Sequence, residues 1–484
     1  MLNVSLSKFK SQYLRKKNQI LYYSIKTNGE KEIDNLINNF LIEKDSFIFE
    51  SVEKGFIKGR YTIFGRNPDK IWEFNNNNCK LFYKNKSKKL NGSPKKNIEK
   101  IIENFNFKIP KGLPPISSIL SGYFSYDIIR YIEKIPNCTK NDLNIPDARI
   151  LRPRNIIVHD NVVKKLYFIV NIFYDEKINN FNKKISNIKK EIEEMIFLAS
   201  YNSSQLNLSV SKLPKIKSNI SKKKFINNVK KAKKYIKFGD IFQVVLSQRF
   251  ECKLTKKPIE IYKKLRKTNP SPFMYFFNFN DFQIIGASPE ILVRLRNNKI
   301  TIRPIAGTRP RGKNPKKDKS FEKELLKDKK ELSEHLMLLD LGRNDTGKVS
   351  KINTVRVTES FKIERYSHVM HIVSNVEGSF NNKFSKFETL LSGFPAGTVS
   401  GAPKIRAMEI IDELENTRRK VYAGGIGYFS ANGDFDTCIA LRTAISKKNK
   451  FYVQSGAGIV ADSKPINEFN ETVNKAKALI KALE

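Results

Sequence analysis

Two short segments of the chain pair carboxylates at helical spacing. The segment ELSEHLMLLDLGRND (331–345) opens with Glu331 and Glu334, and NEFNETVNKAKALIKALE (467–484) carries Glu468, Glu471 and Lys475. Residues three or four positions apart share one face of a helix. Four converging carboxylates would repel one another, whereas Mg²⁺ accepts such hard oxygen ligands, usually one or two directly with water completing the octahedron. The residues alone leave two interpretations open, a magnesium site and two solvated acidic faces.

Four segments rich in small residues also bear on chemistry. Small residues leave backbone N–H groups accessible to an anionic ligand, although ordinary tight turns use the same residues. Several such segments in one half of the chain favour a binding site. They are PIAGTRPRG (304–312), SGFPAGTVSGAPK (392–404), YAGGIGYF (422–429) and VQSGAGIVAD (453–462).

Two further side chains stand in apolar runs. His371 lies in SHVMHIVSNVEG, a strand-like segment in which a lone histidine is more often a satisfied core residue than a functional one. Arg442 lies in CIALRTAIS, which predicts an arginine in a buried strand. A buried guanidinium needs an anion, and a substrate carboxylate is one candidate.

Composition describes a folded chain with a basic surface. Of the 484 residues, 40% are hydrophobic, with 34 Phe and 18 Tyr, which is ample for a sizeable core and excludes disorder as the class. The formal net charge is +42, yet residues 391–484 hold 13 Lys+Arg against 10 Asp+Glu, a difference of +3. Upstream the lysines are dispersed among Asn and Ile, without zinc-finger spacing or an RNA-binding aromatic motif. The charge therefore favours a solvated surface over nucleic-acid binding.

Membrane, redox and nucleotide signals are missing from the sequence. No apolar run approaches the roughly 18 residues that span a bilayer, and the first 20 residues lack the pattern of a signal peptide. The four cysteines are far apart and contain no C-x-x-C pair, which predicts neither zinc nor disulfides and a reducing, cytoplasmic compartment. No G-x-G-x-x-G follows a strand and no P-loop occurs, so a nucleotide cofactor is not indicated.

The order of predicted elements gives the fold class and a division of the chain. Short β-rich runs alternate irregularly with amphipathic helices, without a βαβ rhythm, which predicts an α+β fold with antiparallel sheets. We expect an N-terminal region (1–200), a polar linker (201–220) and a catalytic region (221–484).

Many motifs, in order, resemble one enzyme family. The segments GDIFQVVLSQRF, NPSPFMYFF, GASPEILVR, PIAGTRPRG, ELSEHLMLLDLGRND, GTVSGAPKIRAMEII, GGIGYFS and QSGAGIVADS together look like anthranilate synthase component I, in the family of chorismate-utilising enzymes. The resemblance covers roughly residues 45 to 480. It implies two antiparallel β-sheets packed orthogonally with helices outside, and a chorismate-binding site in the catalytic region.

The resemblance also implies roles for particular residues. Glu334 and Glu471 match ligands of Mg²⁺, with Glu331 and Glu468 beside them. Glu290 matches a general acid that protonates the departing C4 hydroxyl, His371 is associated with pyruvate elimination, and Thr398 matches a position near the substrate. The positions that match chorismate contacts are Gly307, Thr308, Tyr422, Arg442, Gly456, Ala457, Gly458 and Lys475.

Two positions distinguish members of the family. Gln243 stands where water-using relatives carry a lysine that activates water, and Ala306 stands where many aminodeoxychorismate synthases carry a lysine nucleophile. Both residues favour direct addition of ammonia and formation of anthranilate and pyruvate, a lyase reaction that commits chorismate to L-tryptophan. The alternative activity is that of aminodeoxychorismate synthase component I in the folate pathway.

The resemblance further implies a partner and an inhibitor. No glutaminase nucleophile motif surrounds any cysteine, so ammonia from glutamine would come from a separate amidotransferase subunit. The segment FESVEKG…GRYTIFG (49–65) resembles the family's tryptophan-binding segment, with Glu50 and Ser51 in its key positions. Pro272, Phe273 and Met274 of NPSPFMYF would line the same L-tryptophan site, which predicts feedback inhibition; a turn feeding a buried strand is the alternative interpretation of NPSPFMYF.

Overall fold

The computed structural model describes residues 3–53, 57–84, 86–202, 213–366 and 369–484. Its helices are α1 (Leu6–Leu14), α2 (Glu30–Asn39), α3 (Pro94–Asn104), α4 (Phe181–Ser200), α5 (Lys222–Lys237), α6 (Pro258–Thr268), α7 (Pro315–Leu325), α8 (Lys329–Gly347), α9 (Lys386–Ser392), α10 (Lys404–Leu414) and α11 (Pro465–Ile480), with short 3₁₀ turns η1 (Tyr126–Tyr131), η2 (Gly397–Val399) and η3 (Lys481–Leu483).

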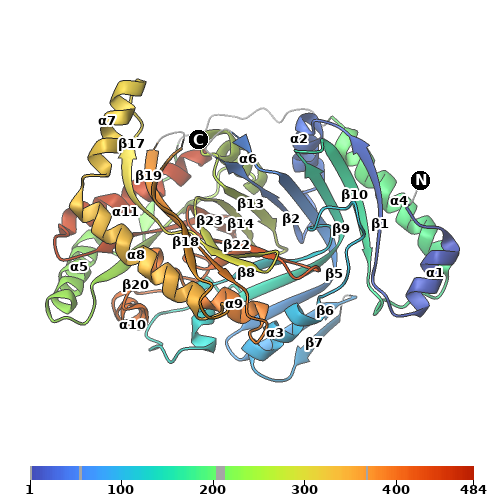
Figure 1. Cartoon of the computed structure of the whole chain (residues 1–484), viewed down its shortest axis with the longest axis horizontal. Helices are drawn as coiled ribbons and strands as arrows, with labels where there is room; N and C mark the ends of the chain where they lie inside the picture. Colours follow the sequence, from blue (N-terminus) through green and yellow to red (C-terminus); the bar gives the residue numbers. More distant parts are fainter. Residues whose placement is uncertain (1–2, 54–56, 85, 203–212, 367–368) are drawn as a thin grey trace.

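Every pairing in the main sheet network is antiparallel, and the strands fall into two series (Figure 1). In sheet order, the first is β1 (Gln19–Lys26), β10 (Lys165–Ile172), β9 (Ala148–Asp160), β5 (Tyr61–Asn75), β2 (Ser46–Glu50), β13 (Phe273–Asn278), β14 (Gln283–Ser288), β23 (Thr443–Lys447), β24 (Lys450–Ile459) and β12 (Gln243–Lys253), which also pairs with β11 (Lys217–Ser218) and β20 (Gly401–Ala402). The second is β7 (Lys86–Leu90), β6 (Asn78–Tyr83), β5, β9, β8 (Ile119–Phe124), β21 (Gly425–Ser430), β22 (Phe435–Ile439), β15 (Ile291–Arg296), β16 (Lys299–Ile302) and β19 (Val369–Ser379), which is flanked by β17 (Ile305–Pro310) and β18 (Arg356–Arg365). A separate small pair joins β3 (Val52–Glu53) to β4 (Ile57–Lys58).

The long strands β5 and β9 belong to both series. They pair along their whole length, with an irregularity between Pro68 and Lys70. Before it, β5 also pairs with β2, and after it with β6. Such a bulge bends and twists a strand pair, which leads the chain from one layer into the other.

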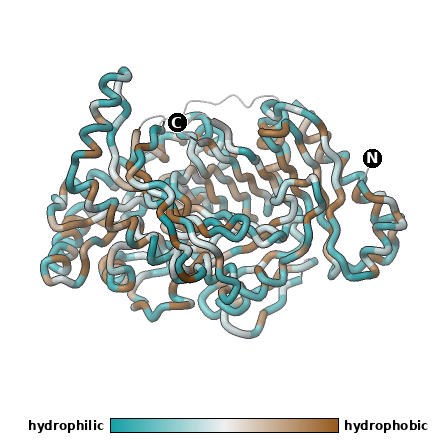
Figure 2. Tube along the Cα trace, viewed as in Figure 1, coloured by the Kyte–Doolittle hydropathy of each residue, from teal (hydrophilic) through white to brown (hydrophobic). Residues whose placement is uncertain are grey.

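Alternating side chains build one core between the layers and two outside them. In β13, Tyr275 and Phe277 face the inner core, whereas Met274 and Phe276 face an outer one. The inner core combines such residues with side chains of the second series, for example Tyr123 of β8. Helices α2, α4, α6 and α11 cover one outer face, and α3, α5, α9 and α10 cover the other. The apolar stretches in Figure 2 follow these strands.

This architecture confirms the predicted α+β class, with antiparallel sheet layers and helices outside. Strand pairing also joins the N-terminal region to the catalytic region: β2 pairs with β13, and β8 pairs with β21. The N-terminal and catalytic regions therefore share one sheet network, and their separation as domains stays a prediction. Residues 203–212, the middle of the predicted linker, lie outside the described part of the chain.

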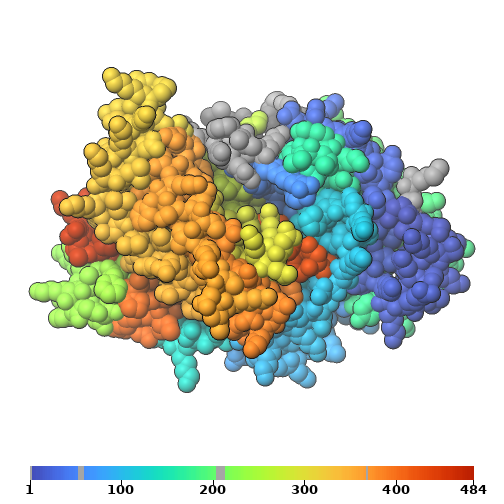
Figure 3. All heavy atoms as spheres, in the orientation of Figure 1, coloured from blue at the N-terminus to red at the C-terminus, as the bar shows by residue number. Residues whose placement is uncertain are grey.

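The elements that carry the candidate site gather on one side of the molecule. Figure 3 shows α7, α8 and the β17–β19 segments, coloured yellow to orange, opposite the blue N-terminal segments. None of the described helices is both long and apolar enough to cross a membrane. The four cysteines are free thiols.

Candidate active site

The two acidic pairs lie on α8 and α11, which the fold brings together. Helix α8 starts at the N-cap Asp328, whose side chain accepts the backbone N–H of Glu331. Burial raises the pKa of Glu334, the charges of Glu331 and Glu471 raise it further, and a hydrogen bond with Gln243 opposes the rise. Burial and the charge of Glu471 likewise raise the pKa of Glu468. The carboxylates therefore act on one another across the two helices.

Two of the four carboxylates already have cationic partners. Arg309 Nη1 lies 3.1 Å from Glu331 Oε1, and Lys475 Nζ lies 2.6 Å from Glu471 Oε1. The same lysine donates a 3.2 Å hydrogen bond to the Gly456 carbonyl. Among the described residues, no group of three or more His, Cys, Asp and Glu side chains could hold a metal ion without other ligands. A cation here would need oxygen donors from water or a substrate.

A third carboxyl group, Glu290, stands between β14 and β15. Thr398 Oγ1, on η2, donates a 3.0 Å hydrogen bond to its Oε2. Burial raises the pKa of Glu290, while Thr398, Arg442 and Lys475 lower it, and the net shift is upward. A carboxyl group with a raised pKa that faces two cations suits proton donation beside an anionic substrate.

The predicted placement of Arg442 in a buried strand is wrong. Arg442 lies in the connection between β22 and β23, with a left-handed φ of 47°. Its side chain is exposed to water, yet the surrounding protein lowers its pKa through desolvation, which Glu290 and Tyr366 oppose. This combination is typical of a side chain that lines a deep concave surface. The turn at a strand end is what aims the guanidinium into the site.

His371 lies on β19 and is anchored to the segment of small residues on β17. Its Nδ1 lies 2.8 Å from the Gly307 carbonyl oxygen and 3.2 Å from Thr308 Oγ1. A carbonyl oxygen only accepts, so Nδ1 carries the proton and Nε2 retains its lone pair. Gly307 has φ 63°, and a Cβ there would lie 3.4 Å from Glu331 Oε2. Gly307 therefore lies beside both the half-buried imidazole of His371 and the carboxylate of Glu331 on α8.

The glycines of β24 make room for neighbouring polar side chains. A Cβ on Gly456 would lie 2.6 Å from the Tyr422 hydroxyl, and a Cβ on Gly458 would lie 2.6 Å from Gln243 Nε2. Tyr422 is buried; burial raises its pKa, as do charges that include Glu290 and Glu471. Between the glycines, Ala457 pairs with Leu246 of β12. The glycines thus allow Tyr422 and Gln243 to reach the same site.

One residue of this cluster was missed from the sequence. Tyr366 follows β18 directly, and its ring packs edge-on against His371 with centroids 5.6 Å apart. Burial raises the pKa of Tyr366, and the nearby carboxylates of Glu364 and Glu290 raise it further. Tyr366 lies five residues before His371 at the end of a strand, and no periodicity in the sequence distinguishes that position.

The residues predicted to bind tryptophan also come together. Glu50 of β2 pairs with Met274 of β13, and Pro272 and Phe273 precede Met274. The Glu50 carboxylate is engaged, because Tyr262 donates to it at 2.7 Å and Arg266 at 2.8 Å.

Ser51 ends this strand beside Gly59. The Gly59 N–H donates to the Ser51 carbonyl at 2.7 Å, and a Cβ on Gly59 would lie 2.6 Å from Ser51 Oγ. Residues 54–56 of the predicted tryptophan-binding segment are outside the described ranges.

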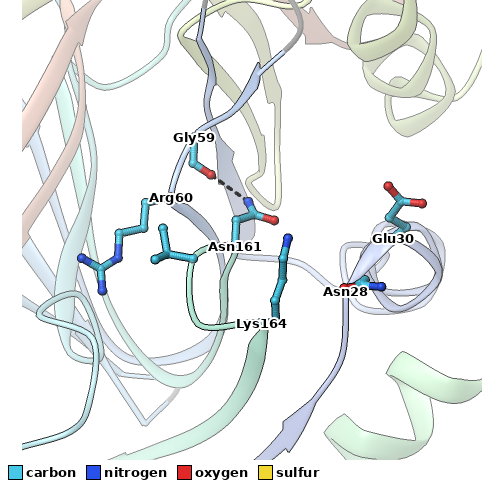
Figure 4. Close-up of a pocket in the computed structure, with 7 residues that line it drawn as sticks. Asn28, Glu30, Gly59, Arg60, Asn161 and Lys164 are labelled. Atoms are coloured by element: carbon cyan, nitrogen blue, oxygen red, sulfur yellow. Dashed lines mark hydrogen bonds between the residues drawn. The ribbon is translucent and has the colours of Figure 1, made fainter.

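A separate cavity of about 610 Å³ opens near Gly59 but contains none of the predicted site residues. Figure 4 shows Asn161 donating to the Gly59 carbonyl, with Lys164 beside it and Glu30 across the opening. The cavity is lined by residues of the β9–β10 turn, by Gly59 and Arg60, and by residues at the start of α2. It is distinct from the candidate active site.

Comparison with known proteins agrees with this site. The profile of the chorismate binding enzyme family matches residues 45–481. Anthranilate synthase component 1 of Cereibacter sphaeroides is 45% identical, covering 99% of this chain and 97% of the relative. That of Acetivibrio thermocellus is 46% identical over 90% of each chain.

Solved structures show the same fold. The crystal structure of anthranilate synthase component I from Streptococcus pneumoniae superimposes with a TM-score of 0.79 at 37% identity, covering 87% of this chain and 92% of that one. The menaquinone-specific isochorismate synthase from Escherichia coli gives a TM-score of 0.72 at 17% identity over 99% of both chains, which shows the shared fold alone. With a family match across most of its length and a site built from the segments that carry the resemblance, this chain belongs to the chorismate binding enzyme family, as a relative of anthranilate synthase component 1.

Proposed function

We propose that the chain is the large subunit of an anthranilate synthase, a lyase that converts chorismate and ammonia into anthranilate and pyruvate and commits chorismate to L-tryptophan. The observation that carries the proposal is the cluster around Glu290, where a carboxyl group with a raised pKa faces Arg442 and Lys475. Chorismate is a dianion, so it needs cations, and its C4 hydroxyl needs a proton donor in order to leave. The names of the relatives described above support the same activity.

The site suits Mg²⁺ as a cofactor. Burial raises the pKa of Glu334 and the charges of Glu331 and Glu471 raise it further, and a divalent cation held by Glu334 and Glu471 would favour the ionised carboxylates. Mg²⁺ is commonly held by one or two carboxylates and completes its shell with water and substrate oxygens, which fits this donor set. Glu331 and Glu468 would support these ligands, Glu331 through its pairing with Arg309. Bound there, the ion would anchor the ring carboxylate of chorismate.

In the first step, ammonia adds at C2 of the ring. The C2–N bond forms, the ring double bonds shift, and the C4–O bond breaks as Glu290 donates its proton to the departing hydroxyl, which leaves as water. The added nitrogen, now an ammonium group, releases one proton to water, and Glu290 regains a proton from water. Gln243 supplies no base to activate water, and ammonia needs none because it is already nucleophilic. Ala306 offers no amine for a covalent intermediate. The product of this step is an amino-substituted dienyl ether.

In the second step, pyruvate leaves and the ring becomes aromatic. His371 Nε2 removes the proton from C2, the electron pair forms the ring double bond, and the C3–O bond breaks. The enolpyruvate released takes a proton on its methylene carbon and becomes pyruvate. Burial lowers the pKa of His371 and so favours the neutral imidazole, and the hydrogen bond to Gly307 places its one proton on Nδ1, which leaves Nε2 free for this task.

Two further points are the source of the ammonia and the inhibition of the enzyme. Ammonia would reach the site from a glutamine amidotransferase subunit, because no glutaminase motif accompanies this chain's cysteines. L-tryptophan would inhibit by binding where Ser51, Pro272, Phe273 and Met274 meet. Glu50 is bonded to Tyr262 and Arg266, so its role there is to fix the end of β2.

A single assay tests the activity. Purified chain is incubated with chorismate, ammonium chloride and Mg²⁺, with and without EDTA, and anthranilate fluorescence is followed. We expect fluorescence that requires Mg²⁺. Chorismate consumption without an aromatic product would instead indicate aminodeoxychorismate synthase, and no consumption would contradict the proposal.

A further inference from the structure

Tyr366 is fixed in place from several directions. Its hydroxyl donates a 2.9 Å hydrogen bond to Glu364 Oε2, and Arg303 Nη2 lies 2.6 Å from the other carboxylate oxygen. Its backbone N–H donates to Val369 at 2.8 Å, and its carbonyl accepts a 2.6 Å hydrogen bond from Arg311. The ring orientation is therefore set by the protein before any ligand binds.

The held ring restrains His371. Its plane meets the imidazole at 63°, with centroids 5.6 Å apart, in the edge-to-face geometry that aromatic pairs prefer. On the other side, the bond from Nδ1 to Gly307 fixes the imidazole at one ring nitrogen. Both polar contacts of the imidazole, with the Gly307 carbonyl and with Thr308 Oγ1, are made at Nδ1, so the ring can still swing about that atom, and the contact with Tyr366 opposes that swing. Together they define where Nε2 points.

We propose that Tyr366, anchored by Glu364 and Arg303, is a positioning residue that aims His371 Nε2 at the C2 proton in the elimination step. This inference rests on the proposed function and deepens it. The bonds made and broken are those of the second step above. When the aim is lost, that proton transfer slows while addition of ammonia and loss of the C4 hydroxyl continue, since those use Glu290 and Thr398. The enzyme would then release the amino-dienyl ether.

The test measures two products rather than one rate. Tyr366→Leu, Tyr366→Phe and Glu364→Gln are assayed with chorismate, ammonium and Mg²⁺, and both anthranilate and the amino-dienyl ether are quantified by liquid chromatography. We expect elimination to slow by about 100-fold in Tyr366→Leu, the scale of a displacement of about 1 Å at a reacting group. Tyr366→Phe keeps the ring and loses one hydrogen bond, so we expect a smaller loss of about three- to tenfold. Glu364→Gln should resemble Tyr366→Phe.

Tyr235→Phe is the matched control, because Tyr235 donates a 2.7 Å hydrogen bond to Glu413 and belongs to no part of the candidate site. It should leave anthranilate as the sole product. The proposed function is tested first by the wild-type chain, which must convert chorismate fully to anthranilate. If chorismate consumption and anthranilate then fall in equal proportion in Tyr366→Phe and Glu364→Gln, or neither changes, Tyr366 does not position His371 and the inference is overturned, whether or not Tyr366→Leu folds.

Discussion

Thr398 donates a 3.0 Å hydrogen bond to Glu290 although the two residues are 108 positions apart. The bond favours the ionised carboxylate and so opposes the upward shift that burial gives to the pKa of Glu290. This hydroxyl contact thus limits how far burial raises the pKa of the proposed general acid.

Thr398→Val should move the alkaline limb of activity to higher pH. A general acid works while protonated, so activity is present below its pKa and is lost as pH rises through it. Removing the hydrogen bond raises the pKa of Glu290 further, which delays that loss. The measurement is kcat against pH at a fixed concentration of free ammonia. Thr358→Val, on exposed β18, is the control, and an unchanged limb in Thr398→Val would contradict this role of Glu290.

Glu334→Gln and Glu471→Gln should each weaken the response to Mg²⁺. Each change removes one charged oxygen donor, and we expect the Mg²⁺ concentration for half-maximal activity to rise at least about tenfold. Glu413→Gln on α10 removes a comparable surface carboxylate and should leave the curve unchanged. Identical Mg²⁺ curves for all three variants would place the cation elsewhere.

Gly458→Ala should impair reaction with ammonia while leaving the fold intact. The new Cβ would meet Gln243 Nε2 at 2.6 Å, and the end of that flexible side chain can move aside. We expect kcat/KM for ammonia to fall about tenfold through displacement of Gln243. Gly347→Ala, where a Cβ meets nothing within 4 Å, is the control. Equal ammonia kinetics in both variants would show that the position of Gln243 is unimportant.

Ser51→Phe should abolish inhibition by L-tryptophan and leave anthranilate formation intact. Ser51 is packed against Gly59, so a bulky side chain must displace the neighbouring segment or fill the proposed pocket. Activity is measured over a range of tryptophan concentrations, with the exposed Ser87→Phe as the control. Inhibition of Ser51→Phe at the same concentrations as wild type would remove this site from the proposal.

Lys420→Met should be the most destabilising of these changes. Lys420 and Asp147 form a fully buried ion pair at 2.7 Å that joins segments 273 positions apart in the sequence. Asp147 also accepts from Tyr131 at 3.0 Å and from the Asn76 N–H at 2.7 Å, so loss of the lysine leaves a buried charge without its cation. We expect the free energy of unfolding to fall by about 3–5 kcal/mol.

Urea unfolding provides the measurement for Lys420→Met. Lys450→Met is the control, because its pair with Glu251 is largely exposed and should contribute about 1 kcal/mol or less. Similar unfolding midpoints for the two lysine variants would contradict the importance of the buried pair.

The features predicted correctly from the sequence are those that depend on residue spacing within a single helix or on motifs in their order along the chain. The spacing of Glu331 and Glu334 put both on one face of α8 because a helix repeats every 3.6 residues. The resemblance at residues 45 to 480 agrees with the family match at 45–481.

Prediction from the sequence failed where a side chain's role depends on a partner distant in the chain. The apolar run around Arg442 suggested a buried strand, but strand pairing ends at Ile439 and resumes at Thr443, leaving Arg442 in a turn that aims into the site. Glu50 gave no sign that Tyr262 and Arg266 would occupy its carboxylate, since they lie on α6 more than 200 positions away.

By itself, the sequence determined the class of the fold, the helices that carry acidic pairs and the family to which the chain belongs, because these follow from local periodicity and from motifs readable in order. Only the tertiary structure decided that Thr398 meets Glu290, that Gly307 fixes the tautomer of His371, and that Tyr366 holds the imidazole from the other side. Those contacts arise from the pairing of strands far apart in the chain, and no repeat within a single element encodes where two such strands will meet.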